Sequence, residues 1–166
     1  MKIRKEVPSD AVAIEAVIIA AFENAAHTEH TEQFIVRELR KFDVLSVSLV
    51  AEDDSEVIGH VAVSPVTISD GSTGWFGLGP LSVSPERQGG GVGTRLVERA
   101  LSELRALGAV GCVVLGRPAY YSRFGFTAEP SLVLPGVRAE NFQAVSFNGS
   151  LPSGTVAYHR AFATKA

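Results

Sequence analysis

The spacing of apolar positions predicts two helices in the first part of the chain, after a short strand over residues 1–7. Residues 8–10, Pro-Ser-Asp, are start signals for the first helix. Its apolar stripe recurs at helical spacing at Ile14, Val17, Ile18, Ala21 and Phe22. The second helix follows a polar segment, carries Ile35 and Leu39 at the same spacing, and ends near Lys41 or Phe42.

Three apolar runs in the middle of the chain predict an antiparallel meander of strands. They cover residues 44–52, 56–68 and 75–83 and are separated by the turn-like segments DDS and SDGSTG. The third run contains Gly79 and Pro80, and proline has no amide hydrogen to donate to a neighbouring strand. We therefore expect a bulge or a splayed edge at this point.

The second half of the chain alternates between helical and strand patterns. A helix over residues 92–107 precedes a fully buried strand over residues 111–116. A short helix opens on Pro118 and closes at Gly125, and another strand follows it. The tail over residues 141–159 has room for two more strands.

Composition indicates one domain and narrows the classes of partner. The 166 residues are 46% apolar, enough for the core of a single domain over residues 1–166. A formal charge of −3 without a basic run argues against nucleic acid as a partner. Neither a signal sequence nor a membrane span is recognisable, so a soluble, cytoplasmic protein is expected. The single cysteine, Cys112, excludes an internal disulfide and a zinc framework of paired cysteines, and no metal is expected.

The glycine-rich loop in PERQGGGVGTRLVERAL, from Pro85 to Leu101, is the strongest candidate for a binding site. It lies between a predicted strand and the N-terminus of a predicted helix. In that setting successive amides can point into one concavity, and the helix dipole adds positive potential. We therefore expect a phosphate there, the alternative being a plain tight turn.

Two common nucleotide-binding motifs do not fit this loop. A P-loop requires GxxxxGK followed by Ser or Thr, but Gly89 and Gly93 are too close together, and Arg95 follows Thr94. A dinucleotide-binding fingerprint would need its third glycine where Leu96 stands, and an acidic residue about twenty residues later to bind a ribose. ATP, GTP and NAD are therefore disfavoured as ligands.

The pattern that fits is Gln88-x-x-Gly91-x-Gly93, preceded by LSVSPE and followed by YYSRFGF and, near the end, by GTVAYHRAF. In these motifs and their order the chain resembles the GNAT superfamily of acetyl-CoA-dependent N-acetyltransferases, and in particular its small bacterial members. The resemblance implies an α/β (α+β) fold with a mixed, mostly antiparallel central sheet and helices on both faces. A splayed pair of strands in that sheet would bind the acetyl donor.

The resemblance also assigns residues to the donor site. The strand before the loop would pair with the pantetheine arm of coenzyme A, and the loop would bind its pyrophosphate. These residues are Leu81, Ser82 and Val83 on the strand and Gln88, Gly89, Gly90, Gly91, Val92, Gly93 and Thr94 in the loop. The expected activity is direct acetyl transfer to an amine of a small molecule or a peptide. The alternative is an acyl-CoA sensor without turnover, and whether the chain forms a homodimer is left open.

Tyr121 matches the tyrosine of the Y-x-x-x-G-F pattern and is expected to be the general acid. A phenol stays protonated at neutral pH and can donate a proton to a departing thiolate. Its neighbour Tyr120 stands where relatives carry an aromatic residue that packs inward, and the same is expected here.

The general base is not assigned, because residues 75–83 contain no carboxylate where many family members carry a glutamate. Glu32, His30, His60 and an ordered water are the candidates. The polar segment from Asn24 to Glu32 is expected to select the acceptor. Structural roles are expected for Cys112 as a small apolar residue, Trp75 as core, His159 as a hydrogen-bonding group and Arg117 as a surface charge.

Overall fold

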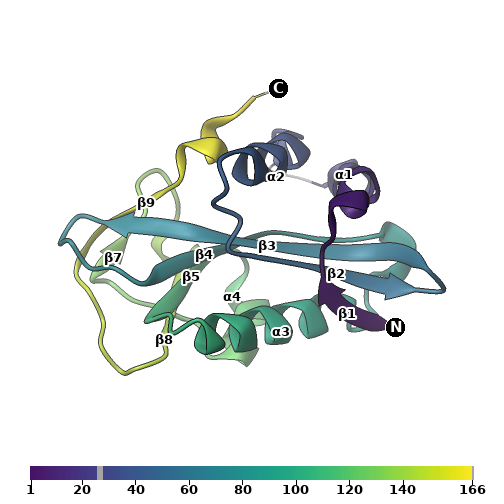
Figure 1. Cartoon of the computed structure of the whole chain (residues 1–166). Helices are drawn as coiled ribbons and strands as arrows, with labels where there is room; N and C mark the ends of the chain where they lie inside the picture. The colour runs from purple at the N-terminus through teal and green to yellow at the C-terminus, as the bar shows by residue number, and fades with distance from the viewer. Residues whose placement is uncertain (26–27, 166) are drawn as a thin grey trace.

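A central sheet covered by helices on both faces makes up the computed structural model, which describes residues 1–25 and 28–165 (Figure 1). Helices α1 (Ala11–Phe22) and α2 (Glu32–Lys41) cover one face, and α3 (Val92–Ala106) and α4 (Pro118–Tyr121) lie on the other. Within the described ranges, the helices are too short or too polar to cross a bilayer.

The strands are ordered β1-β2-β3-β4-β5-β8-β6 across the sheet, and β9 pairs with β3 and with β7. Their bounds are β1 (Lys2–Lys5), β2 (Val47–Asp53), β3 (Glu56–Ile68), β4 (Trp75–Val83), β5 (Gly111–Leu115), β6 (Thr127–Ala128), β7 (Leu132–Val133), β8 (Phe142–Ser146) and β9 (Gly154–Tyr158). The neighbours β1 to β4 are antiparallel, as predicted for β2 to β4, whereas β4 and β5 are parallel. The mixed, mostly antiparallel sheet is confirmed, and only the two-residue strand β7 was not foreseen.

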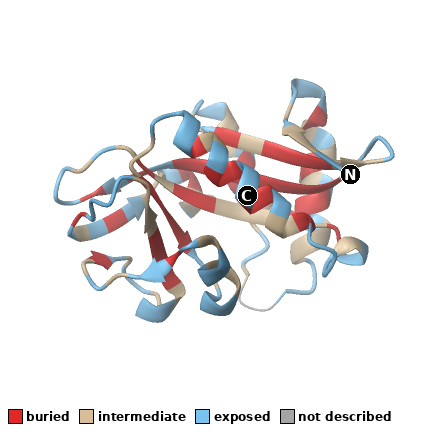
Figure 2. Cartoon of the chain, turned by 90° about the horizontal axis from the view of Figure 1, so that it is seen from below, coloured by how far each residue is buried: buried red, intermediate tan, exposed pale blue. Residues whose placement is uncertain are grey.

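Helix α3 covers the residues for which the amphipathic pattern predicts a helix, and it packs its apolar face on the sheet. Leu96, Val97 and Leu104 are fully buried there against Leu49 and Val61 of the neighbouring strands. Figure 2 shows the result from below, with buried residues along the central strands and exposed ones on the outer side of α3. Because β4 runs directly into the loop before α3, this packing determines where the N-terminus of α3 lies.

Candidate active site

Strands β4 and β5 separate halfway along β4. Their parallel pairing ends with Leu78 opposite Val114. The bulge predicted at Gly79 and Pro80 is confirmed by a shift in the register of β4 against β3. Beyond it, residues 81–83 still pair with β3 but have no partner strand on the side of β5 among the described residues. A ligand that hydrogen bonds like a strand can use this free edge.

The glycine loop leads from this edge of β4 into α3. Gly91 immediately precedes α3 with φ 87°, in the left-handed region that favours glycine. No side chain caps the helix, so the first amides of α3 remain available. Gln88 Nε2 donates a 3.1 Å hydrogen bond to the backbone oxygen of Val83 and thereby fastens the loop to the end of β4. The predicted loop residues, Gln88 to Thr94, thus surround one helix N-terminus.

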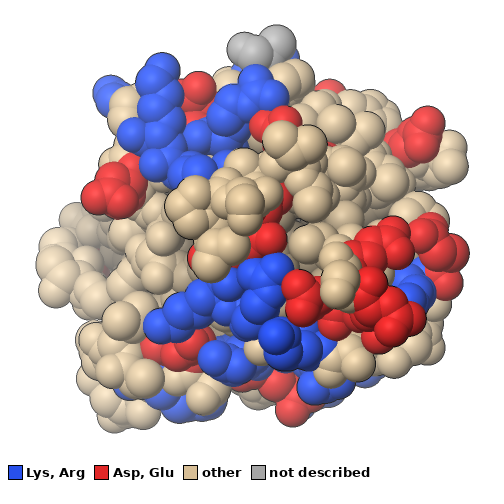
Figure 3. Space-filling model, turned by 45° about the vertical axis from the view of Figure 1, so that its right-hand side comes forward, with Lys and Arg blue, Asp and Glu red and all other residues tan. Residues whose placement is uncertain are grey.

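Acidic and basic side chains gather on adjoining parts of the molecular surface, and one ion pair between them involves the loop. In Figure 3 acidic side chains gather on the right, and basic side chains form a band beside them. Asp53, at the end of β2, lies 2.7 Å from Arg87 Nη2 in the loop. The hydrogen bond from Arg87 holds the pKa of Asp53 below its usual value. The charge of Arg87 is therefore balanced by Asp53 within the protein.

The adjacent tyrosines of the YYSRFGF segment have different surroundings. Tyr121 packs against the core, with its ring centroid 5.9 Å from that of Phe126, and it fills the space where a Cβ on Gly116 would lie. Burial raises the pKa of Tyr121 to about 12. Tyr120 places its hydroxyl 3.4 Å from Thr94 Oγ1, on the first turn of α3. The Tyr120 ring packs against Tyr121 and Phe124 at the edge of the core cluster, while its hydroxyl faces α3.

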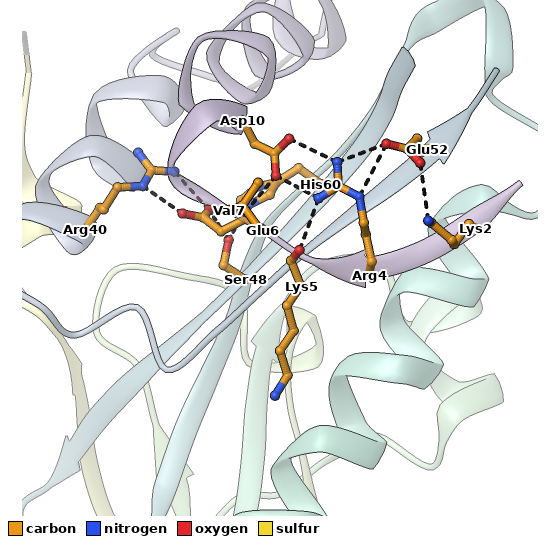
Figure 4. Close-up of polar contacts among 10 residues, drawn as sticks. All are labelled: Lys2, Arg4, Lys5, Glu6, Val7, Asp10, Arg40, Ser48, Glu52 and His60. Atoms are coloured by element: carbon orange, nitrogen blue, oxygen red, sulfur yellow. Dashed lines mark hydrogen bonds and ion pairs between the residues drawn. The ribbon is translucent and has the colours of Figure 1, made fainter. Parts of the chain in front are cut away.

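His60, one candidate for the general base, is enclosed in a polar network between the sheet and the helices above it (Figure 4). Its side chain is 0% exposed, and its Nε2 lies 2.8 Å from Ser48 Oγ and 3.7 Å from the Glu6 carboxylate. Burial lowers the pKa of His60, which is therefore neutral at physiological pH. A side chain without exposed surface cannot contact an acceptor amine directly.

The Glu6 carboxylate is the centre of this network and joins β1, β2 and α2. It accepts hydrogen bonds of 2.9 and 3.0 Å from Arg40 Nε and Nη2, and another from the Ser48 hydroxyl. Burial alone would raise the pKa of Glu6, but the contacts with His60, Arg40 and Ser48 hold it far below its usual value. The network therefore fixes α2 against the sheet through a charged group.

The other two candidates for the base lie at the start of α2. His30 is exposed, with φ 59°. Glu32 Oε2 accepts a hydrogen bond from the Thr28 hydroxyl. Its Oε1 is enclosed and has no hydrogen-bond partner among the described residues. The segment from Asn24 to Glu32, expected to select the acceptor, includes residues 26 and 27, which lie outside the described part.

Sequence reasoning missed Tyr158 of β9, whose ring lies over β4 beside the divergence from β5. The ring occupies the space where a Cβ on Gly77 would be, one residue before Leu78. Tyr158 is held there by the pairing of β9 with β3, opposite Val66. In the sequence, the only sign of this contact is the glycine at position 77, which leaves room for a ring. That the ring belongs to Tyr158 follows from the long-range pairing of β9 with β3.

Structural roles are confirmed for the remaining residues considered. Cys112 is fully buried in β5, and burial raises the pKa of its thiol. Trp75 is 2% exposed and belongs to the core. His159 Nδ1 accepts a 3.0 Å hydrogen bond from the backbone amide of Ala161. Arg117 is exposed.

Comparisons with known proteins agree with this geometry. Residues 45–128 match the family model of the acetyltransferase (GNAT) domain. The N-acetyltransferase YhbS of Escherichia coli K12 is 41% identical over 127 residues, which cover 76% of this chain and 73% of that protein. A crystal structure of a GNAT family acetyltransferase from Brucella melitensis in complex with acetyl-CoA is 47% identical, with a TM-score of 0.87 and 97% of each chain covered. That of E. coli YhbS in complex with CoA is 36% identical, with a TM-score of 0.87, and covers 99% of this chain and 93% of that one. The chain therefore belongs to the GNAT family of N-acetyltransferases.

Proposed function

We propose that this chain binds acetyl-CoA along the free edge of β4 and transfers the acetyl group to an amine. The observation that carries the proposal is the divergence of β4 and β5 after Leu78, which leaves residues 81–83 paired on one side only. Pantetheine contains amide groups that can hydrogen bond to such an edge, and the N-terminus of α3 suits a diphosphate. The acetyl-CoA and CoA complexes of the two similar structures support the same donor here.

The proposed reaction is direct transfer in a ternary complex. A neutral amine attacks the thioester carbonyl and forms the C–N bond, while a backbone amide near Val83 stabilises the negatively charged oxygen. The amine nitrogen loses a proton to a base. The C–S bond then breaks, and the CoA thiolate takes a proton from the phenol of Tyr121, which solvent later restores.

The position of Tyr121 supports its role as the acid. Burial raises its pKa to about 12, so the phenol carries its proton throughout the neutral range but is a weaker acid than a free phenol. It also belongs to α4, which follows β5, so it approaches the divergence from the strand opposite the pantetheine-binding edge of β4. A proton donor on that side would meet the sulfur as it leaves.

The variant Tyr121→Phe tests the acid, because phenylalanine keeps the ring and removes only the proton. We expect CoA affinity by calorimetry to be retained and turnover by thiol release to fall roughly 10²-fold. Tyr120→Phe, compared at acetyl-CoA concentrations that saturate each variant, should lower turnover much less than Tyr121→Phe. Wild-type turnover by Tyr121→Phe would show that solvent protonates the thiolate. CoA binding without thiol release from any amine offered to the wild type would favour the sensor.

The acceptor is proposed to be an amine of a small molecule or a peptide, selected by the segment from Asn24 to Glu32. Among the side chains considered as base, Glu32 supports this role best, because one of its carboxylate oxygens is enclosed and has no hydrogen-bond partner in the part of the chain that the structure describes. A panel of amines in the thiol-release assay would identify the acceptor. With a good acceptor, Glu32→Gln should lower kcat/KM for the amine while leaving CoA affinity unchanged, and an unaltered kcat/KM would leave His30 or water as the base.

A further inference from the structure

The hydroxyl of Tyr120 lies directly over the first turn of α3. It is 3.4 Å from Thr94 Oγ1, and a Cβ added to Gly93 would be 3.1 Å from the same hydroxyl oxygen. Tyr120 belongs to α4, which follows β5, whereas α3 follows β4. The Tyr120 side chain therefore bridges the two halves of the site at the point where the phosphates of the donor are proposed to bind.

Arg123 adds a positive charge to this bridge. Its guanidinium carbon lies 4.7 Å from the centroid of the Tyr120 ring, in a cation–π arrangement. Among the described residues no carboxylate forms an ion pair with Arg123, in contrast to Arg87 of the loop, which is held by Asp53. Arg123 is thus a cation beside Tyr120 whose charge no carboxylate in the described part of the chain neutralises.

We propose that Tyr120 and Arg123 form the α4 half of a diphosphate-binding site for the acyl donor. The proposal rests on the proposed function and extends it to residues outside the glycine loop. The Tyr120 hydroxyl donates a hydrogen bond to a phosphate oxygen held by the amides of α3, and the ring orients Arg123 so that its guanidinium neutralises the same diphosphate. Because Thr94 and Tyr120 each carry a hydroxyl hydrogen, both can turn from one another toward an anion.

Calorimetry with CoA and with 3′-dephospho-CoA tests this assignment. Tyr120→Phe removes one hydrogen bond to a charged group and should weaken CoA binding about tenfold. Arg123→Gln should weaken it about fivefold at low salt and by clearly less at 0.5 M salt, because ions screen an exposed charge. The control Arg138→Gln alters an exposed arginine paired with Glu140 and should leave the affinity unchanged. Urea unfolding of each variant verifies that the fold is kept.

The two ligands separate the diphosphate from the 3′-phosphate. If both residues contact the diphosphate, each variant should lose the same factor with 3′-dephospho-CoA as with CoA. A loss for Arg123→Gln confined to CoA would overturn its assignment to the diphosphate. Wild-type affinity in both variants would overturn the proposal but leave the donor site intact, whereas failure of the wild-type protein to bind CoA would overturn the proposed function as well.

Discussion

Replacing Glu6 with glutamine should destabilise the fold markedly, because it removes the carboxylate that forms an ion pair with Arg40 in the network of Figure 4. The carboxylate accepts two hydrogen bonds from Arg40 and one from Ser48. A hydrogen bond to a charged group contributes about 1.5–3 kcal/mol and a neutral one about 0.5–1.5. Removal of one partner of a fully buried ion pair lowers the free energy of unfolding by about 3–5 kcal/mol.

The partial exposure of Glu6 and Arg40 determines where the expected loss of stability falls among these energies. The Glu6 side chain is 16% exposed and that of Arg40 is 29% exposed, so water can partly solvate Arg40 in the variant. We therefore expect Glu6→Gln to lower the free energy of unfolding by about 2–3 kcal/mol. For a chain of this size the change corresponds to a Tm lower by roughly 5–10 °C.

Urea unfolding followed by circular dichroism would measure this loss, provided the m-value is unchanged. A double-mutant cycle with Arg40→Met should show that the two single losses do not add, with a coupling of about 1 kcal/mol or more. The control Arg138→Gln removes a pair that is 80% and 63% exposed and should change stability by less than about 0.5 kcal/mol. A loss below about 1 kcal/mol in Glu6→Gln, or strictly additive losses, would refute the view that this charge holds α2 on the sheet.

Three further predictions concern ligand binding and pH. Gly91→Val should weaken CoA binding about tenfold or more, because a Cβ obstructs the approach of the diphosphate to the backbone, and unchanged affinity by calorimetry in the folded variant would exclude the phosphate site. In thermal unfolding, CoA should protect the chain far better than ATP or NAD at equal concentration, since only CoA carries the pantetheine arm, and equal protection by NAD would revive the dinucleotide interpretation. Stability should fall as the pH drops below about 6.5 and again below about 4.5, because the pKa values of His60 and Glu6 are lowered in the folded chain, so the unfolded chain binds these protons more readily. Urea midpoints across this range would measure the effect, and in His60→Gln the first decline should be absent.

Much of the fold could be predicted from the sequence because its signals are local. The apolar stripe of α3, the glycine before it and the bulge at Pro80 each depend on the conformational preferences of neighbouring residues. The order of these elements, read with the Gln88-x-x-Gly91-x-Gly93 pattern, also led to the family. Strand β7 was not predicted, since two residues become a strand only when a partner strand lies beside them.

The sequence by itself thus determined the elements, their order and the family, whereas the tertiary structure decided which side chains meet. Tyr120 and Tyr121 are adjacent in the sequence, and only the contacts of α4 with α3 and with the core show that Tyr120 faces α3 while Tyr121 packs inward. His60 lies beside Glu6, which is far from it in the chain, and the ring of Tyr158 uses the space left by Gly77. Helical and strand periodicity arise from contacts a few residues apart, but a site is built from contacts between distant segments, which only the packing of the whole chain specifies.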